Sequence, residues 1–169
     1  RCKQQYTGEL ELALGRAKFE RLKDRPADCP ERTAAQFYLA ETIRFNVGAV
    51  DAAKVIYEEI LAVYRRTLGA DHPNTLCVLD SLGELFLVQG QHAKALPLLE
   101  EALERGRVVL GPEDRHTLCS LSSLGRLHQN RGDYDRALPL LEFDLAASRR
   151  TLGNAHHDTL VSLANLGLC

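Results

Sequence analysis

The sequence predicts an all-α protein, an α-solenoid in which antiparallel pairs of helices follow one another along the chain. The first observation is a repeat: residues 75–116 and 117–158 align without a gap and share 19 of 42 positions. The second is that single residues recur at the same 42-residue spacing, as Thr33, Thr75, Thr117 and Thr159, as Gly48, Gly90 and Gly132, and as Gly69, Gly111 and Gly153. A fixed period of this length is typical of solenoids, whose repeats cannot bury their apolar faces alone.

The period divides the chain into repeats. Residues 33–74, 75–116 and 117–158 form three of them, and residues 159–169 match the first part of a fourth. Residues 1–32 align poorly with these, and we interpret them as the second helix and the loop of a divergent preceding unit. Because the sequence begins at Arg1 and contains no methionine, we expect its natural start to lie further upstream.

The helical pattern is weakest in the first part of the chain. Residues 8–24 carry apolar side chains at roughly helical spacing, and Pro26 and Pro30 are expected to end this helix. The next repeat is predicted to form a first helix over residues 33–47, ended by Gly48, and a second helix over residues 51–66. The expected apolar faces of these two helices are Phe37, Ala40, Ile43 and Val47, and then Ala53, Ile56, Tyr57, Ile60 and Leu61.

The following two repeats show one pattern more clearly. Each has a first helix, a glycine turn and a second helix, so each forms an antiparallel pair. Their expected apolar positions are Leu76, Leu79, Leu82 and Phe86, then Ala95, Leu96, Leu99, Ala102 and Leu103, and, one period later, Leu118, Leu121, Leu124, Ala137, Leu138, Leu141 and Leu145. Gly83 and Gly125 lie inside first helices, where glycine costs about 1 kcal/mol relative to alanine. We therefore expect the partner helix to pack too closely for a Cβ atom. Pro97 and Pro139 lie inside second helices and are expected to bend them.

Polar residues at the fixed spacing are assigned to helix ends. The four threonines are expected to satisfy free backbone N–H groups in the first turn of each first helix. Arginines near the ends of second helices are expected to complement the helix dipole and to reach glutamates two turns back or a neighbouring repeat, with a basic docking strip as the alternative. These are Arg65, Arg107 and Arg149, facing Glu58, Glu100 and Glu142. The histidines, among them His72 and His156, are interpreted as loop and capping residues because no metal-ligand spacing surrounds them.

Composition narrows the possible partners and compartments. Apolar residues make up 45% and charged residues 26% of the chain, and the net charge is −2. This charge gives no reason to expect nucleic acid as a partner, and no apolar run approaches the roughly 20 residues that span a bilayer. The five cysteines do not form a disulfide framework: Cys77 and Cys119 hold equivalent positions on helices expected about 8–10 Å apart. We interpret them as reduced thiols that fill small interface positions, in the cytoplasm or another reducing compartment, which leaves an organelle matrix open.

The repeat pattern resembles that of a known family. Leu79, Leu82-Gly83, Phe86, Gly90, Ala95, Leu99 and Ala102, with their counterparts in the next repeat, look like the tetratricopeptide repeat (TPR). The segment Arg66-Thr67-Leu68-Gly69-Ala70-Asp71-His72-Pro73 and the sequence A-L-P-L-L-E are similar to the 42-residue repeats of kinesin light chains and nephrocystin-like proteins. The resemblance covers about residues 33–169 and implies a right-handed superhelix.

The resemblance also implies a binding surface. In the tetratricopeptide fold, the face of each first helix opposite its core stripe lines a concave groove that takes an extended peptide or a partner's helix. The matching residues here are Tyr38, Thr42, Asn46, Asp80, Glu84, Ser122, Arg126, Gln129 and Asn130. Asp80 and Glu84 would repel a carboxylate, so we expect no binding of chaperone C-terminal tails. We expect instead a preference for a segment that offers Lys or Arg, with a merely solvated acidic face as the alternative.

The sequence therefore predicts a non-catalytic protein-interaction scaffold without cofactor or metal. We find no glycine-rich phosphate loop, nucleophile elbow or Cys–His pair that would indicate catalysis. Two alternatives remain: a structural subunit built permanently into a large complex, and a regulatory module of a larger enzyme. We expect residues 159–169 to expose an apolar face at Leu160, Leu163 and Leu166, and to fray or self-associate in isolation.

Overall fold

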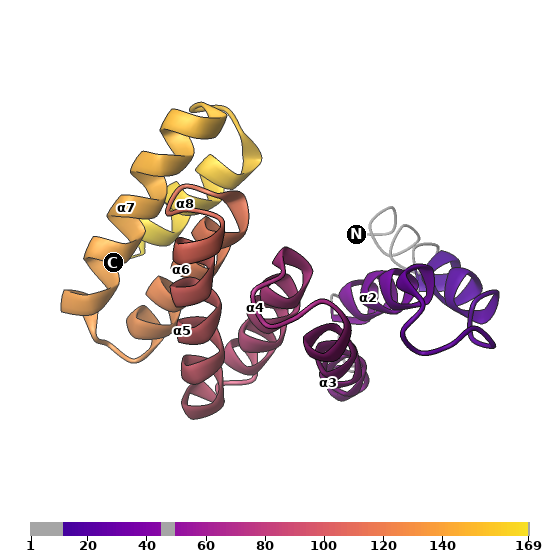
Figure 1. Ribbon diagram of the computed structural model, residues 1–169. Helices are drawn as coiled ribbons and strands as arrows, with labels where there is room; N and C mark the ends of the chain where they lie inside the picture. Colours follow the sequence, from indigo (N-terminus) through magenta and orange to yellow (C-terminus); the bar gives the residue numbers. More distant parts are fainter. Residues whose placement is uncertain (1–11, 45–49, 169) are drawn as a thin grey trace. The chain divides into compact units, whose positions relative to one another are not determined.

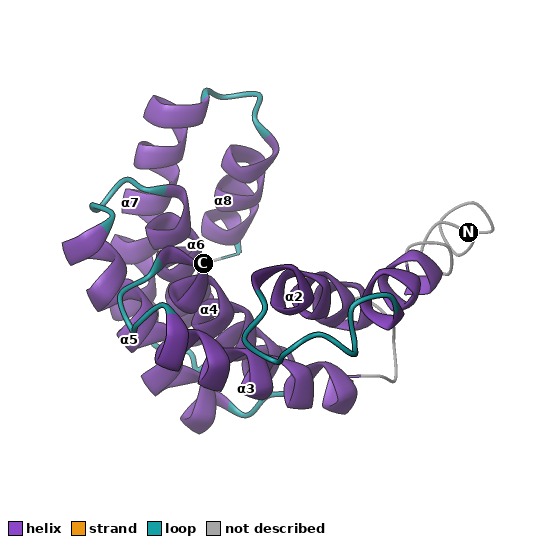
Figure 2. Cartoon of the chain, turned by 45° about the vertical axis from the view of Figure 1, so that its right-hand side comes forward, coloured by secondary structure: helices purple, strands orange, loops and turns teal. Residues whose placement is uncertain are grey.

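The computed structural model describes residues 12–44 and 50–168, and in these ranges the regular structure is helical throughout (Figures 1 and 2). A helical stretch at residues 12–20 is followed by seven helices. Their bounds are α2 Pro30–Arg44, α3 Val50–Thr67, α4 Pro73–Val88, α5 His92–Val109, α6 Arg115–Asn130, α7 Tyr134–Leu152 and α8 His157–Gly167. The all-helical prediction and the order of first and second helices are confirmed, while the handedness of a superhelix stays a prediction.

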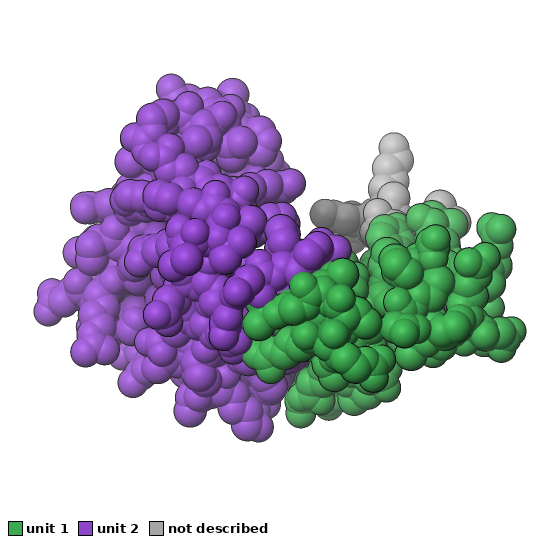
Figure 3. All heavy atoms as spheres, viewed as in Figure 1, with its two compact units in different colours: residues 1–70 green, residues 71–169 purple. Residues whose placement is uncertain are grey.

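The chain divides into two compact units, residues 1–70 and residues 71–169 (Figure 3). In unit 1, α2 packs against α3. Ala40, Ala53, Tyr57 and Ile60 are fully buried there. The Tyr57 ring lies 6.0 Å from that of Phe37, centroid to centroid, and its hydroxyl donates to Glu41 Oε1 at 2.6 Å. Tyr57 thus fills the core with its ring and satisfies its polar atom at the edge.

The start of α2 differs from the prediction. Pro30 was expected to help end the preceding helix, yet it is the first residue of α2. Proline suits this position because it has no N–H to leave unpaired and its φ is already helical. The buried face also differs: Leu39 and Ala35 are buried, whereas Phe37 is only half-buried. Val47 and Gly48 lie outside the described residues.

In unit 2, α4 pairs with α5 and α6 with α7, α5 packs on α6, and α8 packs on α7. The first helices α4, α6 and α8 also contact one another in turn. Nearly all predicted apolar positions of these helices are buried, with Leu79, Leu99, Leu121 and Leu141 at 0% exposure. The exceptions are Leu96, which is half-buried, and Leu138, its counterpart one period later, which is 38% exposed. Leu138 follows Ala137, which is fully buried, so the 100° step to the next residue turns Leu138 away from the core.

The two glycines inside first helices sit where the structure leaves no room for a side chain. A Cβ atom on Gly83 would lie 2.6 Å from Leu99 Cδ2, and one on Gly125 would lie 2.6 Å from Leu141 Cδ2. Leu99 and Leu141 are the same position one period apart. The predicted close approach is confirmed, and it lets a leucine of the second helix lie directly over the backbone of the first.

The caps of the first helices are not the threonines, which corrects the prediction. The N-cap residues are His72, Asp114 and His156, again 42 residues apart, and each side chain accepts a hydrogen bond from the backbone N–H two residues on. The capping role assigned to the two histidines is confirmed. Thr75 and Thr117 lie in the first turn and are fully buried. At the equivalent position, the Thr159 hydroxyl donates to the carbonyl of Ser148 at 3.2 Å, so this threonine helps to join one repeat to the next.

The turns and last turns of the helices follow the predicted pattern in part. Gly90 and Gly132 have φ of +70° and +75°, a conformation that favours glycine and ends the first helices.

In the described part of the chain, ion pairs between neighbouring repeats involve other arginines than the predicted ones. Arg105 pairs with Asp71, and Arg150 with Glu113, instead of Arg107 and Arg149. Solvent screens these exposed pairs, so each contributes little to stability.

Candidate functional site

The predicted groove residues of unit 1 are only partly accessible. Tyr38 is 37% exposed, and Lys18 Nζ lies 4.6 Å from its ring centroid. Thr42 is buried, and its hydroxyl donates to the carbonyl of Tyr38. Asn46 lies outside the described residues. Of the two described residues, only Tyr38 therefore offers a surface to a partner in this unit.

The charged groove residues of unit 2 pair with each other. Glu84 of α4 and Arg126 of α6 hold the same position one period apart, and Arg126 Nη1 lies 3.1 Å from Glu84 Oε1. The Ser123 hydroxyl donates to the same oxygen at 3.2 Å. Because α4 and α6 lie side by side, equal positions on them meet. The two charges thus largely neutralise each other, and their ion pair links α4 to α6 on this face.

A second polar chain joins α6 to α8. Asn165 Nδ2 donates to Ser122 Oγ at 3.0 Å, and Gln129 Nε2 donates to the backbone carbonyl of Asn165 at 3.3 Å. Asn130 is exposed. Asn165 and Ser123 were not among the predicted site residues. The 42-residue period could have found both, since Asn165 lies one period after Ser123 and Ser123 is adjacent to Ser122.

Cys119 of α6 lies on the same face, one period after Cys77. It is exposed, which corrects its assignment as an interface filler. Burial, and next the nearby Asp80 carboxylate, raise the pKa of its thiol to about 12. Cys119 is thus accessible to water while protein atoms surround it, as expected for a side chain on a concave surface. The Glu84 and Asp158 carboxylates raise this pKa further and Arg115 lowers it, so the field at this point is negative.

Behind this face lies a buried carboxyl group. Asp144 of α7 is 2% exposed and lies in the core, at the position that Ala102 holds one period earlier. Burial raises the pKa of Asp144, and the nearby hydroxyls of Ser162, Ser122 and Ser148 oppose that rise. The Ser148 hydroxyl lies 3.5 Å from Oδ1, whereas Oδ2 is buried with no hydrogen-bond partner. Sequence reasoning missed Asp144, although its departure from the alanine of the preceding repeat was visible.

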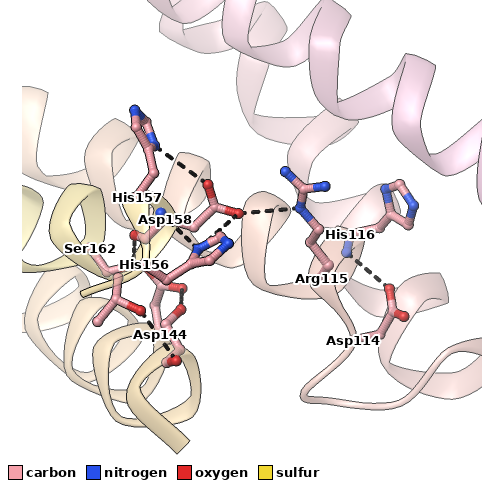
Figure 4. A network of polar contacts seen from close by, with 10 residues as sticks. Asp114, Arg115, His116, Asp144, His156, His157, Asp158 and Ser162 are labelled. Carbon is pink, nitrogen blue, oxygen red and sulfur yellow. Dashed lines mark hydrogen bonds and ion pairs between the residues drawn. The ribbon is translucent and has the colours of Figure 1, made fainter. Parts of the chain in front are cut away.

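The N-terminus of α8 gathers several charged groups above this carboxyl (Figure 4). Asp158 Oδ2 lies 3.2 Å from Arg115 Nε of α6, and Asp158 Oδ1 lies 3.5 Å from His157 Nδ1. The Ser162 hydroxyl donates to the carbonyl of Asp158 at 3.0 Å. Within residues 12–44 and 50–168, no three His, Cys, Asp or Glu side chains come together as metal ligands would.

A cleft lined by leucines and polar side chains opens beside α8. Its volume is about 370 Å³, and it is lined by Leu145, Arg149, Asn154, Thr159, Leu160 and Leu163. Leu160 and Leu163 are 53% and 46% exposed. Their counterparts Leu118 and Leu121 are buried in α6, which has neighbours on both sides. The apolar face predicted for this helix is therefore present at these two leucines, while Leu166 is half-buried.

Comparison with known proteins settles the family. The tetratricopeptide repeat model matches residues 31–107, 81–142 and 116–169, which together cover most of the chain. The chain belongs to the tetratricopeptide repeat family. None of the described helices combines the length and the apolar character that crossing a membrane requires. A search among curated proteins gave no match.

Solved tetratricopeptide structures resemble the whole chain. Two crystal structures of nearly identical TPR-like repeats, assigned to a kinesin light chain of Podosopora anserina, have TM-scores of 0.76 and 0.74 with 27% and 28% identity. Each comparison covers 96% of this chain and 77% of the other. BtubC (BKLC) from P. vanneervenii has a TM-score of 0.77 at 20% identity, over 98% of this chain and 66% of that one, and shows the shared fold. The resemblance to kinesin-light-chain repeats is thus confirmed.

Proposed function

We propose that this tetratricopeptide chain is a non-catalytic scaffold that binds a peptide or a helix of a partner protein on the polar face of its first helices. Tetratricopeptide repeats are generally protein-interaction modules. The observation that carries the proposal is the ordered polar surface of unit 2, where Ser122, Arg126 and Asn165 are each held by a neighbouring helix. A surface that is held in place before binding loses less conformational entropy when a partner arrives.

The charge of this face favours a basic partner segment. Its α4 and α6 residues include two carboxylates, Asp80 and Glu84, against one guanidinium, Arg126. The negative field at Cys119 supports the same preference. We assign the preference to Asp80 and Glu84 together, although Glu84 also pairs with Arg126. We place the chain in the cytoplasm or another reducing compartment, in keeping with the reduced thiols of Cys29, Cys77 and Cys119.

A peptide array with matched basic, neutral and acidic sequences tests the proposal. Basic peptides should bind best, and Asp80→Lys should weaken their binding about tenfold, since the loss of one favourable charge contact is worth roughly 1.4 kcal/mol. Glu142→Lys makes the same charge change at an exposed position of α7 and should leave binding unchanged. The binding proposal fails if no peptide class binds, and the charge preference fails if Asp80→Lys binds basic peptides as well as the wild type.

One observation favours a second function, that of a subunit built permanently into a larger complex. The cleft beside α8 is lined by Leu160 and Leu163, which are about half exposed, and exposed apolar side chains that lie together often mark protein interfaces. A pull-down from cells with a competing peptide separates the two functions. A partner held in the groove is released by excess peptide, whereas a subunit held by the α8 surface stays bound.

A further inference from the structure

The three first helices of unit 2 present different chemistry on the same face. Positions one period apart lie side by side, because α4 contacts α6 and α6 contacts α8. Two such sets of positions are Asp80, Ser122 and Ala164, and Glu84, Arg126 and Leu168. The face therefore changes from acidic on α4, through polar on α6, to apolar on α8.

The apolar end of the face is exposed. Val161, one period after Cys119, is 43% exposed, and Leu168, the C-cap residue of α8, is 74% exposed. Ala164 is exposed as well. At 100° per residue these three side chains lie within about 60° of one another, whereas Leu163, which lines the cleft, points about 160° away from Val161. The apolar end of the face is thus a different surface from the cleft beside α8.

The charges on the two ends of the face differ. On α8 the single carboxylate is that of Asp158, and its Oδ2 lies 3.2 Å from Arg115 Nε. On α4 the carboxylates of Asp80 and Glu84 are close enough to the face to raise the pKa of the Cys119 thiol on α6. A cation on the face is therefore attracted toward α4, and an apolar side chain is accommodated at α8.

We propose that this face takes an extended partner segment with two anchors, a Lys or Arg over the acidic residues of α4 and a large apolar side chain over Val161 and Leu168. This inference rests on the proposed function, because it says which segment the face selects. The apolar anchor contributes affinity because both side chains lose contact with water on binding. Together with the charged anchor it gives the face a selectivity that charge alone does not provide.

The spacing of the anchors follows from the packing of the helices. Packed helices lie about 8–10 Å apart, so α8 lies roughly 20 Å from α4 across α6. An extended chain advances about 3.3 Å per residue, so about six residues separate the two anchors. Between them the segment crosses the polar side chains of Ser122, Arg126 and Asn130 on α6. Such side chains can bind the unpaired N–H and C=O groups of an extended backbone, whereas those of a helix are already paired.

Fluorescence anisotropy with labelled peptides and the 169-residue chain tests the two anchors separately. The reference peptide carries a pair of lysines and, about six residues further on, a leucine, within a sequence of serine and glycine. In matched peptides the leucine or the lysines are replaced by asparagine, or the spacing is halved or doubled. We expect the leucine to tighten binding about tenfold over asparagine at the reference spacing, and less at the other spacings.

Two substitutions on α8 separate this face from the cleft. Val161 and Leu163 are 43% and 46% exposed, so they are matched in exposure on opposite sides of the helix. Val161→Ala removes two methyl groups from the contact and should leave only about a twofold gain from the leucine, with no change for the asparagine peptide. Leu163→Ala should change neither. Asp80→Lys should weaken both peptides while the gain from the leucine persists, because distant contacts act independently.

Three results would overturn the inference. They are a leucine that adds no affinity at any spacing, a gain that is undiminished when Val161→Ala and Leu168→Ala are combined, and a best spacing of about thirteen residues, which is that of a helix at 1.5 Å per residue. If the substituted chains do not fold, the peptide series on the wild type still decides. Lysine peptides that bind without any gain from the leucine refute this inference and leave the proposed function intact, whereas a chain that binds no peptide refutes both.

Discussion

The absence of a Cβ atom at Gly125 allows α7 to approach α6 closely. The glycine at the same position of α8, Gly167, serves as a control for substitution. In Gly125→Ala the new Cβ would lie 2.6 Å from Leu141 Cδ2, and Leu141 is fully buried, so it has little space into which to move. We expect a loss of about 1–3 kcal/mol in the free energy of unfolding, which outweighs the helical preference of alanine.

Gly167→Ala, one period later, is the matched control for this substitution. Nothing lies within 4 Å of a Cβ atom at that position, so the change should alter stability by less than about 1 kcal/mol, in the favourable direction. Urea unfolding of the two variants gives the comparison. Equal effects would mean that the close contact in α6 is not what requires glycine.

Asp144 should make stability depend on pH in an unusual direction. Its pKa in the folded chain is raised, mainly by burial, so the folded state holds a proton that the unfolded state has already lost. Stability therefore falls as the pH rises from the unfolded value, about 3.9, through the folded one. Asp144→Asn should be more stable than the wild type at pH 7, and the difference should shrink toward about pH 4. Chemical unfolding at both pH values measures it.

Asp144→Ala restores the residue that stands at this register position in the preceding repeat, Ala102. It should show the same pH-dependent gain as Asp144→Asn, because both variants remove the ionisable group. A gain in only one of them would point to packing or to the new amide as the cause, and a wild type that becomes more stable between pH 4 and pH 7 relative to both would refute the argument.

The structural roles of some single residues could be predicted from the sequence, whereas those of others could not. Gly83 and Gly125 were predictable because a costly residue recurs in register, which requires a packing reason. Cys119 and the threonines were misassigned, because periodicity shows that a position is equivalent without showing what lies next to it. The pairing of Glu84 with Arg126 follows from the period only once α4 and α6 are known to lie side by side.

At the scale of the helices, α8 should be the least protected element of unit 2. It packs on α7 and weakly on α6, and it leaves Leu160 and Leu163 exposed. With fewer buried apolar contacts, its local opening requires less free energy than that of the helices with neighbours on several sides. Hydrogen exchange in a chain of these 169 residues should be faster in residues 157–167 than in residues 75–110. Equal protection in a monomeric sample would contradict this expectation.

The order and type of the helices were predictable from the sequence, whereas their first residues were less so. Gly90 and Gly132 ended helices as expected, since a positive φ favours glycine. Helix starts were placed at the threonines, but the chain begins its first helices two residues earlier, after His72, Asp114 and His156. Histidine is an uncommon N-cap residue. The recurring threonines were therefore the stronger indication of a helix start, although they lie inside the first turn.

At the scale of the whole molecule, damage to the core should stay close to where it is made. Leu124→Ala removes a side chain that is 6% exposed and should cost about 2–5 kcal/mol in unfolding free energy. Because repeats in a solenoid contact only their neighbours, faster hydrogen exchange is expected in α6 and α7, with little change in α2 and α3. A cost below about 1 kcal/mol would show that the assigned register is wrong. Leu138→Ala, at an exposed position, is the control and should cost less.

The contacts of Gly83 with Leu99 and of Gly125 with Leu141 each lie within one repeat, and this bears on how the gene can change. Unequal recombination that duplicates residues 117–158 keeps the inner contact in both copies. At the new junction, Ser148 of the first copy would lie beside Thr117 of the second copy in place of Thr159. In the same way, Asp144 of the first copy would lie beside Ser120 of the second in place of Ser162. At both positions one hydroxyl group replaces another. Descendants of this chain with one repeat more should therefore fold without further mutation.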